Sequence, residues 1–305
     1  MAEQPTLIYD RIGDNRRNTW LLLLTFVLLV GGFVVAMGII LGLPYPVAPI
    51  IVIPVIIFAL FSYYSSTSIT LAISRAHEVT REEEPELFRT VENLCIGAGL
   101  PMPKVYVIED GSPNAFATGR DPDHAVVCVT RGLLQKLDHL ELEGVIAHEL
   151  SHIGNYDIRL MTVVVVLVGV IALLADFMLR LTIWGAGGRS NNRERGGGYV
   201  TLIIYAVAII AVILTPIAAQ LIKLALSRQR EYLADASAAE LTRYPEGLAR
   251  ALEKISADTD PLEEANKATA HLYIANPLHE HSSFLNNLFS THPPIEERIA
   301  VLRAM

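Results

Sequence analysis

Two histidines and one glutamate at helical spacing are the residues of this sequence best suited to chemistry. His148, Glu149 and His152 form the pattern H-E-x-x-H within residues 147–157. On a helix the two histidines lie one turn apart on the same face, so both imidazoles can bind one metal ion, with the glutamate beside them as a base. Zinc suits these ligands. The alternative is a surface helix that carries two histidines by chance.

A catalytic zinc ion needs a third protein ligand, and Glu231 is the candidate. Asp235 follows one helical turn later and can accept the free ring N–H of a ligating histidine. The pattern E-x-x-x-D is common on solvated helices, but here it follows an apolar run closely, just as His152 closely precedes one. Both ligands should therefore lie roughly 10 Å above the same membrane surface. This set of residues predicts hydrolysis in which zinc polarises the scissile carbonyl and Glu149 takes a proton from water and passes it to the leaving amine.

The composition indicates a membrane protein. Of 305 residues, 52% are apolar and 18% are charged, which is unusual for a soluble protein of this size. The net charge of −8, with no long basic stripe, excludes nucleic acid as a partner. Cys95 and Cys128 lie in apolar stretches, so we expect core packing and no disulfide framework.

Four apolar runs predict four transmembrane helices arranged as two hairpins. The first, 20–43, contains no charge and is too long for the apolar core of a signal peptide. The others are 47–64, a run from 158 that continues in amphipathic form to 184, and 199–221. The expected organisation is a cytoplasmic amino terminus at 1–19, a first hairpin at 20–74, a protease domain at 75–157, a second hairpin at 158–226 and a carboxy-terminal part of that domain at 227–305.

Between and after the hairpins the sequence predicts a small α+β domain. A helix is expected at 85–98, strands at 104–108 and 124–130, and a weaker strand between them at 114–118. The expected helices that follow are 131–137, the helix of the metal motif, 220–241, 245–257, 261–275 and 294–304.

The sequence resembles the HtpX-type membrane-bound zinc metalloproteases, relatives of the CAAX prenyl proteases among the gluzincins. The resemblance covers nearly the whole chain: the paired amino-terminal spans, N-A-F-A at 114–117, H-E-x-x-H with Asn155 and Asp157 after it, the second hairpin, E-Y-x-A-D at 231–235, and S-T-H-P-P at 290–294 with Arg298. It implies a mainly α membrane protein with four transmembrane helices and a cytoplasmic gluzincin-type α+β protease domain.

The resemblance also implies an activity and a location. The expected enzyme is an ATP-independent endopeptidase with one zinc ion per chain, which cleaves misfolded or damaged membrane proteins and also itself. Its expected partners are protein substrates, chiefly membrane proteins, and the lipid bilayer. Its expected location is the inner membrane of a bacterial cell, multi-pass, with the protease domain facing the cytoplasm.

Two further elements are expected to serve the substrate. Asn114, Ala115 and Phe116, continuing to Ala117, predict an exposed edge strand that pairs with the substrate backbone; an ordinary core strand is the alternative. His292, before a predicted last helix, is expected to stabilise the oxyanion, as a histidine does in the prenyl-protease relatives. The alternative is that Thr291 caps that helix and His292 faces solvent.

Two other functions remain open from the sequence. A channel or transporter could carry a regulatory metal, but the four apolar runs contain almost no polar groups to line a path. An inactive membrane adaptor could keep zinc for stability, but a structural site has no use for the base Glu149.

Overall fold

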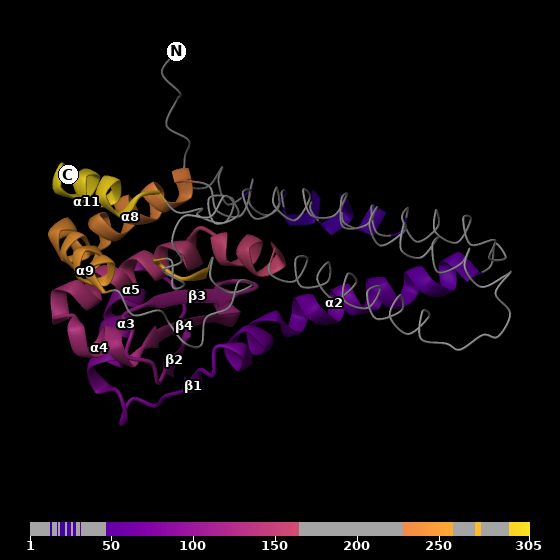
Figure 1. Cartoon of the computed structure of the whole chain (residues 1–305), viewed down its shortest axis with the longest axis horizontal. Coiled ribbons are helices and arrows are strands. Elements are labelled where there is room, and N and C mark those ends of the chain that lie inside the picture. Colours follow the sequence, from indigo (N-terminus) through magenta and orange to yellow (C-terminus); the bar gives the residue numbers. More distant parts are fainter. Residues whose placement is uncertain are drawn as a thin grey trace, which may run out of the picture.

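The computed structural model describes residues 13, 17, 19–21, 23–25, 27–28, 31, 47–164, 228–258, 272–275 and 293–305. The expected transmembrane helices at 20–43, 158–184 and 199–221 lie wholly or partly outside these residues. Within them the structure is a small mixed sheet with helices packed on it, from which one long helix, α2 (Val47–Ile73), projects (Figure 1).

The sheet has four strands in the order β1-β2-β4-β3. Strand β2 (Lys104–Ile108) pairs in parallel with β4 (Ala125–Thr130), and β3 (Ala115–Gly119) pairs with β4 in antiparallel register. The short strand β1 (His77–Glu78) lies beyond β2. Because side chains alternate along a strand, valines of β2 and β4 such as Val105 and Val127 enter the core while their neighbours face the other side. In the strand order given above, β3 lies at one edge of the sheet.

Helix α5 (His139–Gly154) is the central element of the domain. Its first turn has a capping box, in which the Asp138 carboxylate accepts the Glu141 N–H at 3.0 Å and the Glu141 carboxylate accepts the Asp138 N–H at 2.8 Å. The helix lies between the sheet on one side and α8 (Arg228–Thr242) and α9 (Pro245–Ala257) on the other (Figure 1). A Cβ on Gly144 would lie 2.6 Å from the backbone nitrogen of Leu248, so this glycine permits the close crossing of α5 and α9.

The remaining helices complete the packing around α5. Helix α3 (Pro85–Ala98) packs against α5, and α4 (Arg131–Lys136) follows β4 directly. Helix α11 (Ile295–Arg303), at the carboxyl end, packs on α8 and α9. Both cysteines, Cys95 and Cys128, are free and buried, which confirms the expected core role.

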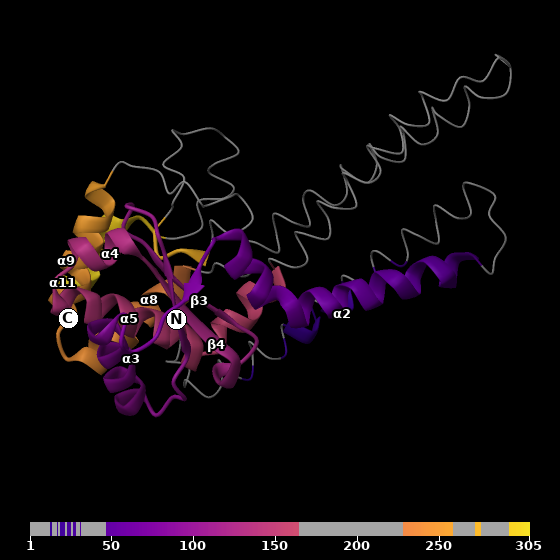
Figure 2. The same cartoon turned by 90° about the horizontal axis from the view of Figure 1, so that it is seen from below.

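Helix α2 includes the predicted second span, 47–64, and continues to Ile73. It runs away from the sheet and helices in both views (Figures 1 and 2). In the part of the chain that the structure describes, no helix is both long and apolar enough to cross a membrane.

Within the described residues the elements follow the sequence expectation, apart from three differences. The short strand β1 was not predicted. The strand predicted from His124 begins at Ala125, because Pro122–His124 forms a short 3₁₀ helix capped by the Asp121 side chain. The helix predicted at 261–275 is wrong at its described end: Leu272–Ala275 is a bent, non-α-helical segment. The physical reason is that Ile274 donates its backbone N–H to β3 instead of to a preceding carbonyl of a helix.

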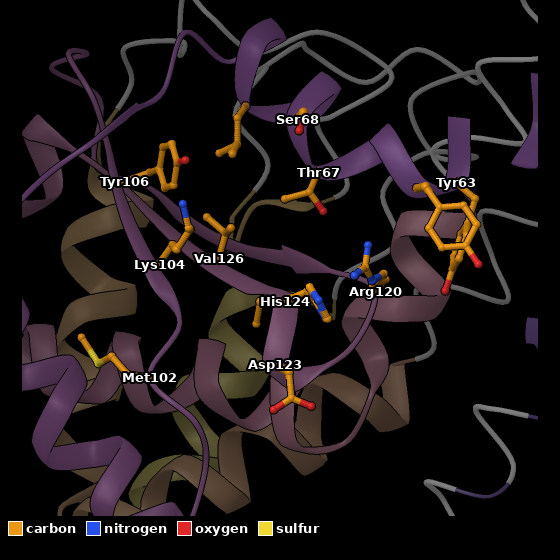
Figure 3. A pocket seen from close by; sticks show the side chains of 13 residues that line it. Tyr63, Thr67, Ser68, Met102, Lys104, Tyr106, Arg120, Asp123, His124 and Val126 are labelled. Atoms are coloured by element: carbon orange, nitrogen blue, oxygen red, sulfur yellow. The ribbon is translucent and has the colours of Figure 1, made fainter. Parts of the chain in front are cut away.

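A cavity of about 310 Å³ lies between α2 and the sheet face opposite α5 (Figure 3). Tyr63 of α2 and Lys104 and Tyr106 of β2 line it; the last two alternate with the valines that enter the core. Two of its polar side chains donate to one carboxylate: Lys104 Nζ donates to Glu78 at 3.1 Å, and Tyr106 Oη donates to the same group at 3.0 Å. This cavity is thus separated by the sheet from the H-E-x-x-H helix.

Candidate metal centre

Helices α5 and α8 bring the three expected metal ligands together. His148 and His152 lie one turn apart on α5, and Glu231 lies in the first turn of α8, which packs directly on α5. One donor atom from each of the three residues lies within 4.8 Å of the others. All three side chains are buried. The fold therefore brings Glu231 next to the two histidines, although the whole segment between α5 and α8 separates them in the sequence.

Hydrogen bonds to carboxylates orient both imidazoles. His148 Nδ1 lies 2.9 Å from Asp235 Oδ1, and His152 Nδ1 lies 3.1 Å from Asp157 Oδ2. Because an ionised carboxylate only accepts, each Nδ1 carries the donated proton, and Nε2 is the nitrogen of each ring that is left for a metal ion. The two Nε2 atoms face one another at 3.2 Å. Asp235 makes the contact with His148 that its spacing predicted, and Asp157 makes the same kind of contact with His152.

The electrostatics of the two histidines differ. Burial lowers the pKa of His148 to about 4, against the opposing effect of Asp235, so this imidazole is neutral at pH 7. Burial also opposes the charge of His152, but the Asp157 hydrogen bond and the Glu231 carboxylate together raise its pKa to about 9. With this pKa the His152 imidazole also carries a proton on Nε2 at pH 7. A divalent cation bound by Glu231 and both Nε2 atoms would replace that proton.

The donor set fits a zinc ion. Tetrahedral ligands bound to zinc at about 2.0–2.1 Å lie about 3.3 Å from one another. The separation of the Nε2 atoms is 3.2 Å, and each lies 3.7 Å from an oxygen of Glu231. Two nitrogens and one carboxylate with no fourth protein donor in the described group are typical of catalytic rather than structural zinc.

Glu149 lies between the metal ligands and the edge of the sheet. It is buried, and its carboxylate accepts the backbone N–H of Ala117 in β3. Burial raises the pKa of Glu149 to about 7; the nearby Glu231 adds to the rise, and His152 opposes it. A carboxylate with a pKa close to neutrality suits both acceptance and return of a proton.

Arg298 of α11 belongs to the centre, although the sequence predicted no contact between it and the metal ligands. Its side chain is fully buried, and Nε and Nη2 donate to the two oxygens of Asp235 at 2.9 and 2.7 Å. Nη1 donates to the carbonyl of Ile274 at 3.2 Å and lies 3.6 Å from Glu231. Burial raises the pKa of Asp235, but Arg298 and His148 outweigh it and hold that pKa at about 2. The only sequence signal was the resemblance, in which this arginine takes part.

The predicted substrate strand is at the sheet edge, as expected, but it is not exposed. All five residues of β3 are buried, and so is Asn114. The prediction of an exposed edge was wrong because α5 packs on one face of β3 and Leu272–Ala275 lies along its open side. His292, the expected oxyanion residue, lies outside the described residues.

Comparison with known proteins assigns the family. The model of peptidase family M48 matches residues 81–305. The chain belongs to this family. It is a metallopeptidase, and a relative named Protease HtpX homolog in Dictyoglomus thermophilum is 49% identical over 99% of this chain and 96% of its own length.

Other relatives agree with the family, and one solved structure has a similar fold. Protease HtpX homologs of Tropheryma whipplei strain TW08/27 and Listeria monocytogenes serotype 4a are 45% and 48% identical, over 98% of this chain and 99% and 100% of their own lengths. The crystal structure of S. mikatae Ste24p has a similar fold, with a TM-score of 0.51 at 18% identity, covering 95% of this chain and 66% of that one.

Asp235→Asn is expected to weaken metal affinity or activity about 10–100-fold, because the amide orients His148 less firmly than a carboxylate. The same change removes the charge of the carboxylate that accepts two hydrogen bonds from the buried Arg298, so the unfolding temperature should also fall. Metal titration and thermal unfolding of the variant measure the two effects. Glu240→Gln, an exposed position on the same helix, is the matched control. Unchanged metal affinity in the Asp235 variant would contradict the role of this contact.

Proposed function

We propose that this chain is an integral-membrane zinc endopeptidase that hydrolyses peptide bonds of misfolded or damaged membrane proteins. The observation that carries the proposal is the buried group of His148, His152 and Glu231, with the base Glu149 between this group and a sheet edge. The family supports peptide hydrolysis. The membrane location rests on the apolar composition and on the resemblance to HtpX-type proteases.

The chain's own residues divide the chemistry between them. Zinc held by the two histidines and Glu231 would supply Lewis-acid polarisation of the scissile carbonyl and activation of water. Glu149 takes the proton of the attacking water and later gives it to the leaving amine. The N–H of Ala117, which the Glu149 carboxylate accepts in this structure, belongs to the strand that would hold the substrate backbone.

A proteolysis assay with and without a chelator tests this function. The purified full-length chain in detergent should cleave an unfolded protein such as casein, stop when a chelator removes the metal, and recover when zinc is returned. A channel, a transporter or an inactive adaptor would show no chelator-sensitive cleavage. That result would reject the proposal.

The proposed topology places the amino terminus inside the cell. Four spans then put residues 75–157 and 222–305 on one side, as a shared metal site requires, and most arginines flanking the spans fall on the cytoplasmic side. The loop with Arg189, Arg193 and Arg195 falls outside, against the positive-inside rule. Reporters fused at residues 120 and 190 should show opposite sidedness. The same sidedness at both would mean that the second hairpin does not span the bilayer.

His292 is proposed to stabilise the negative charge that develops on the substrate carbonyl oxygen. Because such a group acts mainly on the transition state, His292→Ala should lower the turnover rate about 10²–10³-fold, with little change in the Michaelis constant. Zinc content should stay the same. A variant that loses the metal would instead make His292 a ligand or a structural support, and a normal turnover rate would remove it from the mechanism.

A further inference from the structure

The open side of β3 already holds a piece of the chain. Ile274 donates its backbone N–H to the carbonyl of Ala115 at 2.9 Å. The Asn114 side chain makes two hydrogen bonds to the backbone of Ala275. Its Nδ2 donates to the Ala275 carbonyl at 3.1 Å, and its Oδ1 accepts the Ala275 N–H at 3.4 Å. A peptide backbone is therefore bound at this edge through both its donors and its acceptors.

Side-chain contacts extend the same pairing. The ring of Tyr273 packs edge-on against Phe116 of β3, with centroids 5.0 Å apart. Residue numbers thus rise along the segment while they fall along β3, which is an antiparallel arrangement. Tyr273 and Ile274 are almost completely buried.

This binding position is close to the catalytic base. Ala115 offers its carbonyl and Ala117 its N–H on the same side of β3, and the Ala117 N–H is held by Glu149. Alternate residues of a strand are about 6.8 Å apart. A substrate strand that runs along this edge past Glu149 would need the Ala115 carbonyl that Ile274 occupies.

From these contacts we propose that Leu272–Ala275 is an internal stand-in for substrate, which an incoming peptide displaces from β3. The inference rests on the proposed function and narrows its substrate class. The edge should accept an extended apolar stretch in which an aromatic residue faces Phe116 and is followed by a β-branched and then a small residue, as in Tyr273-Ile274-Ala275.

Displacement of Leu272–Ala275 should leave the metal centre unchanged. Ile274 accepts one hydrogen bond from Nη1 of Arg298, whereas the bonds from Nε and Nη2 hold Asp235 separately. Departure of the segment therefore leaves Asp235 and His148 in place. While the segment is bound, substrate cannot pair with β3. The apparent dissociation constant for substrate is therefore the intrinsic constant divided by the fraction of molecules in which β3 is open.

Hydrogen exchange in the Glu149→Gln protein, loaded with zinc, tests the displacement. The probe is a short synthetic peptide with Leu-Tyr-Ile-Ala at its centre, and the control peptide has serine in place of the tyrosine and isoleucine. At saturation the first peptide should raise exchange of the 272–275 amides about tenfold and leave α5 unchanged. The control peptide should bind about tenfold more weakly. Bound peptide with unaltered exchange at 272–275, or equal binding of both peptides, would overturn the inference.

A reversible cross-link tests the same point through activity. A disulfide needs two Cα atoms about 4.4–6.8 Å apart, a separation that residues joined by a direct backbone hydrogen bond can provide. Ala115 and Ile274 are joined by such a bond and belong to one buried cluster. The Ala115→Cys/Ile274→Cys protein should lose cleavage at least about tenfold when oxidised and regain it on reduction with a phosphine, with its zinc retained throughout.

Each single cysteine variant controls for the substitutions themselves. If the oxidised double variant cleaves as fast as its reduced form, the segment stays in place during catalysis and the inference is wrong. That outcome leaves the proposed function intact, because the function fails only if the unmodified chain shows no chelator-sensitive cleavage.

Discussion

Glu149→Gln is expected to lower proteolysis by about 10²–10⁴-fold while zinc stays bound, since this is the usual contribution of a positioned general base. Glutamine matches the size of glutamate, and its amide oxygen can still accept the N–H of Ala117. It cannot take a proton from water at neutral pH. The three proposed metal ligands are untouched, so the variant separates the loss of a base from the loss of the metal.

The measurement is a steady-state cleavage rate paired with metal analysis of the same preparation. Glu143→Gln, on the same helix and only partly buried, should keep normal activity. Loss of zinc from the Glu149 variant would make this residue a ligand. Retained activity would place the base elsewhere.

The sequence predicted the parts of the centre that depend on local spacing. H-E-x-x-H places His148 and His152 on one face wherever the segment is helical, and the Asp138–Glu141 capping box and Gly154 define where that helix begins and ends. Glu231 and Asp235 required one further premise, that both helices meet at one site. The packing of α5 on α8 agrees with it.

Other contacts depended on tertiary structure that spacing does not encode. The guanidinium of Arg298 reaches Asp235 only because α11 packs on α8, and a single arginine in an amphipathic helix has no pattern that predicts a buried position. Leu272–Ala275 has apolar residues compatible with a helix. A backbone bond to β3, far away in sequence, decides its conformation instead, so periodicity alone predicted the wrong element.

The same limit explains the error over the exposed edge. Small residues such as Ala115 and Ala117 suit a strand at the border of a sheet, and β3 is at that border. Whether such a border is open depends on what covers it. Here Glu149 takes the N–H of Ala117 and Ile274 bonds to Ala115, and neither contact is visible in the pattern of β3 itself.

Glu231→Ala is expected to abolish tight zinc binding and with it all measurable proteolysis. The two imidazoles would remain 3.2 Å apart between Nε2 atoms, but two neutral ligands hold a divalent ion far less firmly than two neutral ligands and a carboxylate. His148 and His152 should keep their hydrogen bonds to Asp235 and Asp157 in this variant. Loss of zinc would then be due to the missing carboxylate and not to misoriented histidines.

Thermal unfolding gives this prediction a readout that is independent of activity. An ion that binds only the folded state adds about 2.7 kcal/mol of stability at a hundred times its dissociation constant, so zinc should raise the unfolding temperature of the unmodified chain and a chelator should lower it. The Glu231→Ala protein should respond to neither. Glu240→Ala, exposed on the same helix, should behave like the unmodified chain. Full zinc occupancy in the Glu231 variant would mean that the third ligand is another residue, and the site would have to be assigned again around the two histidines.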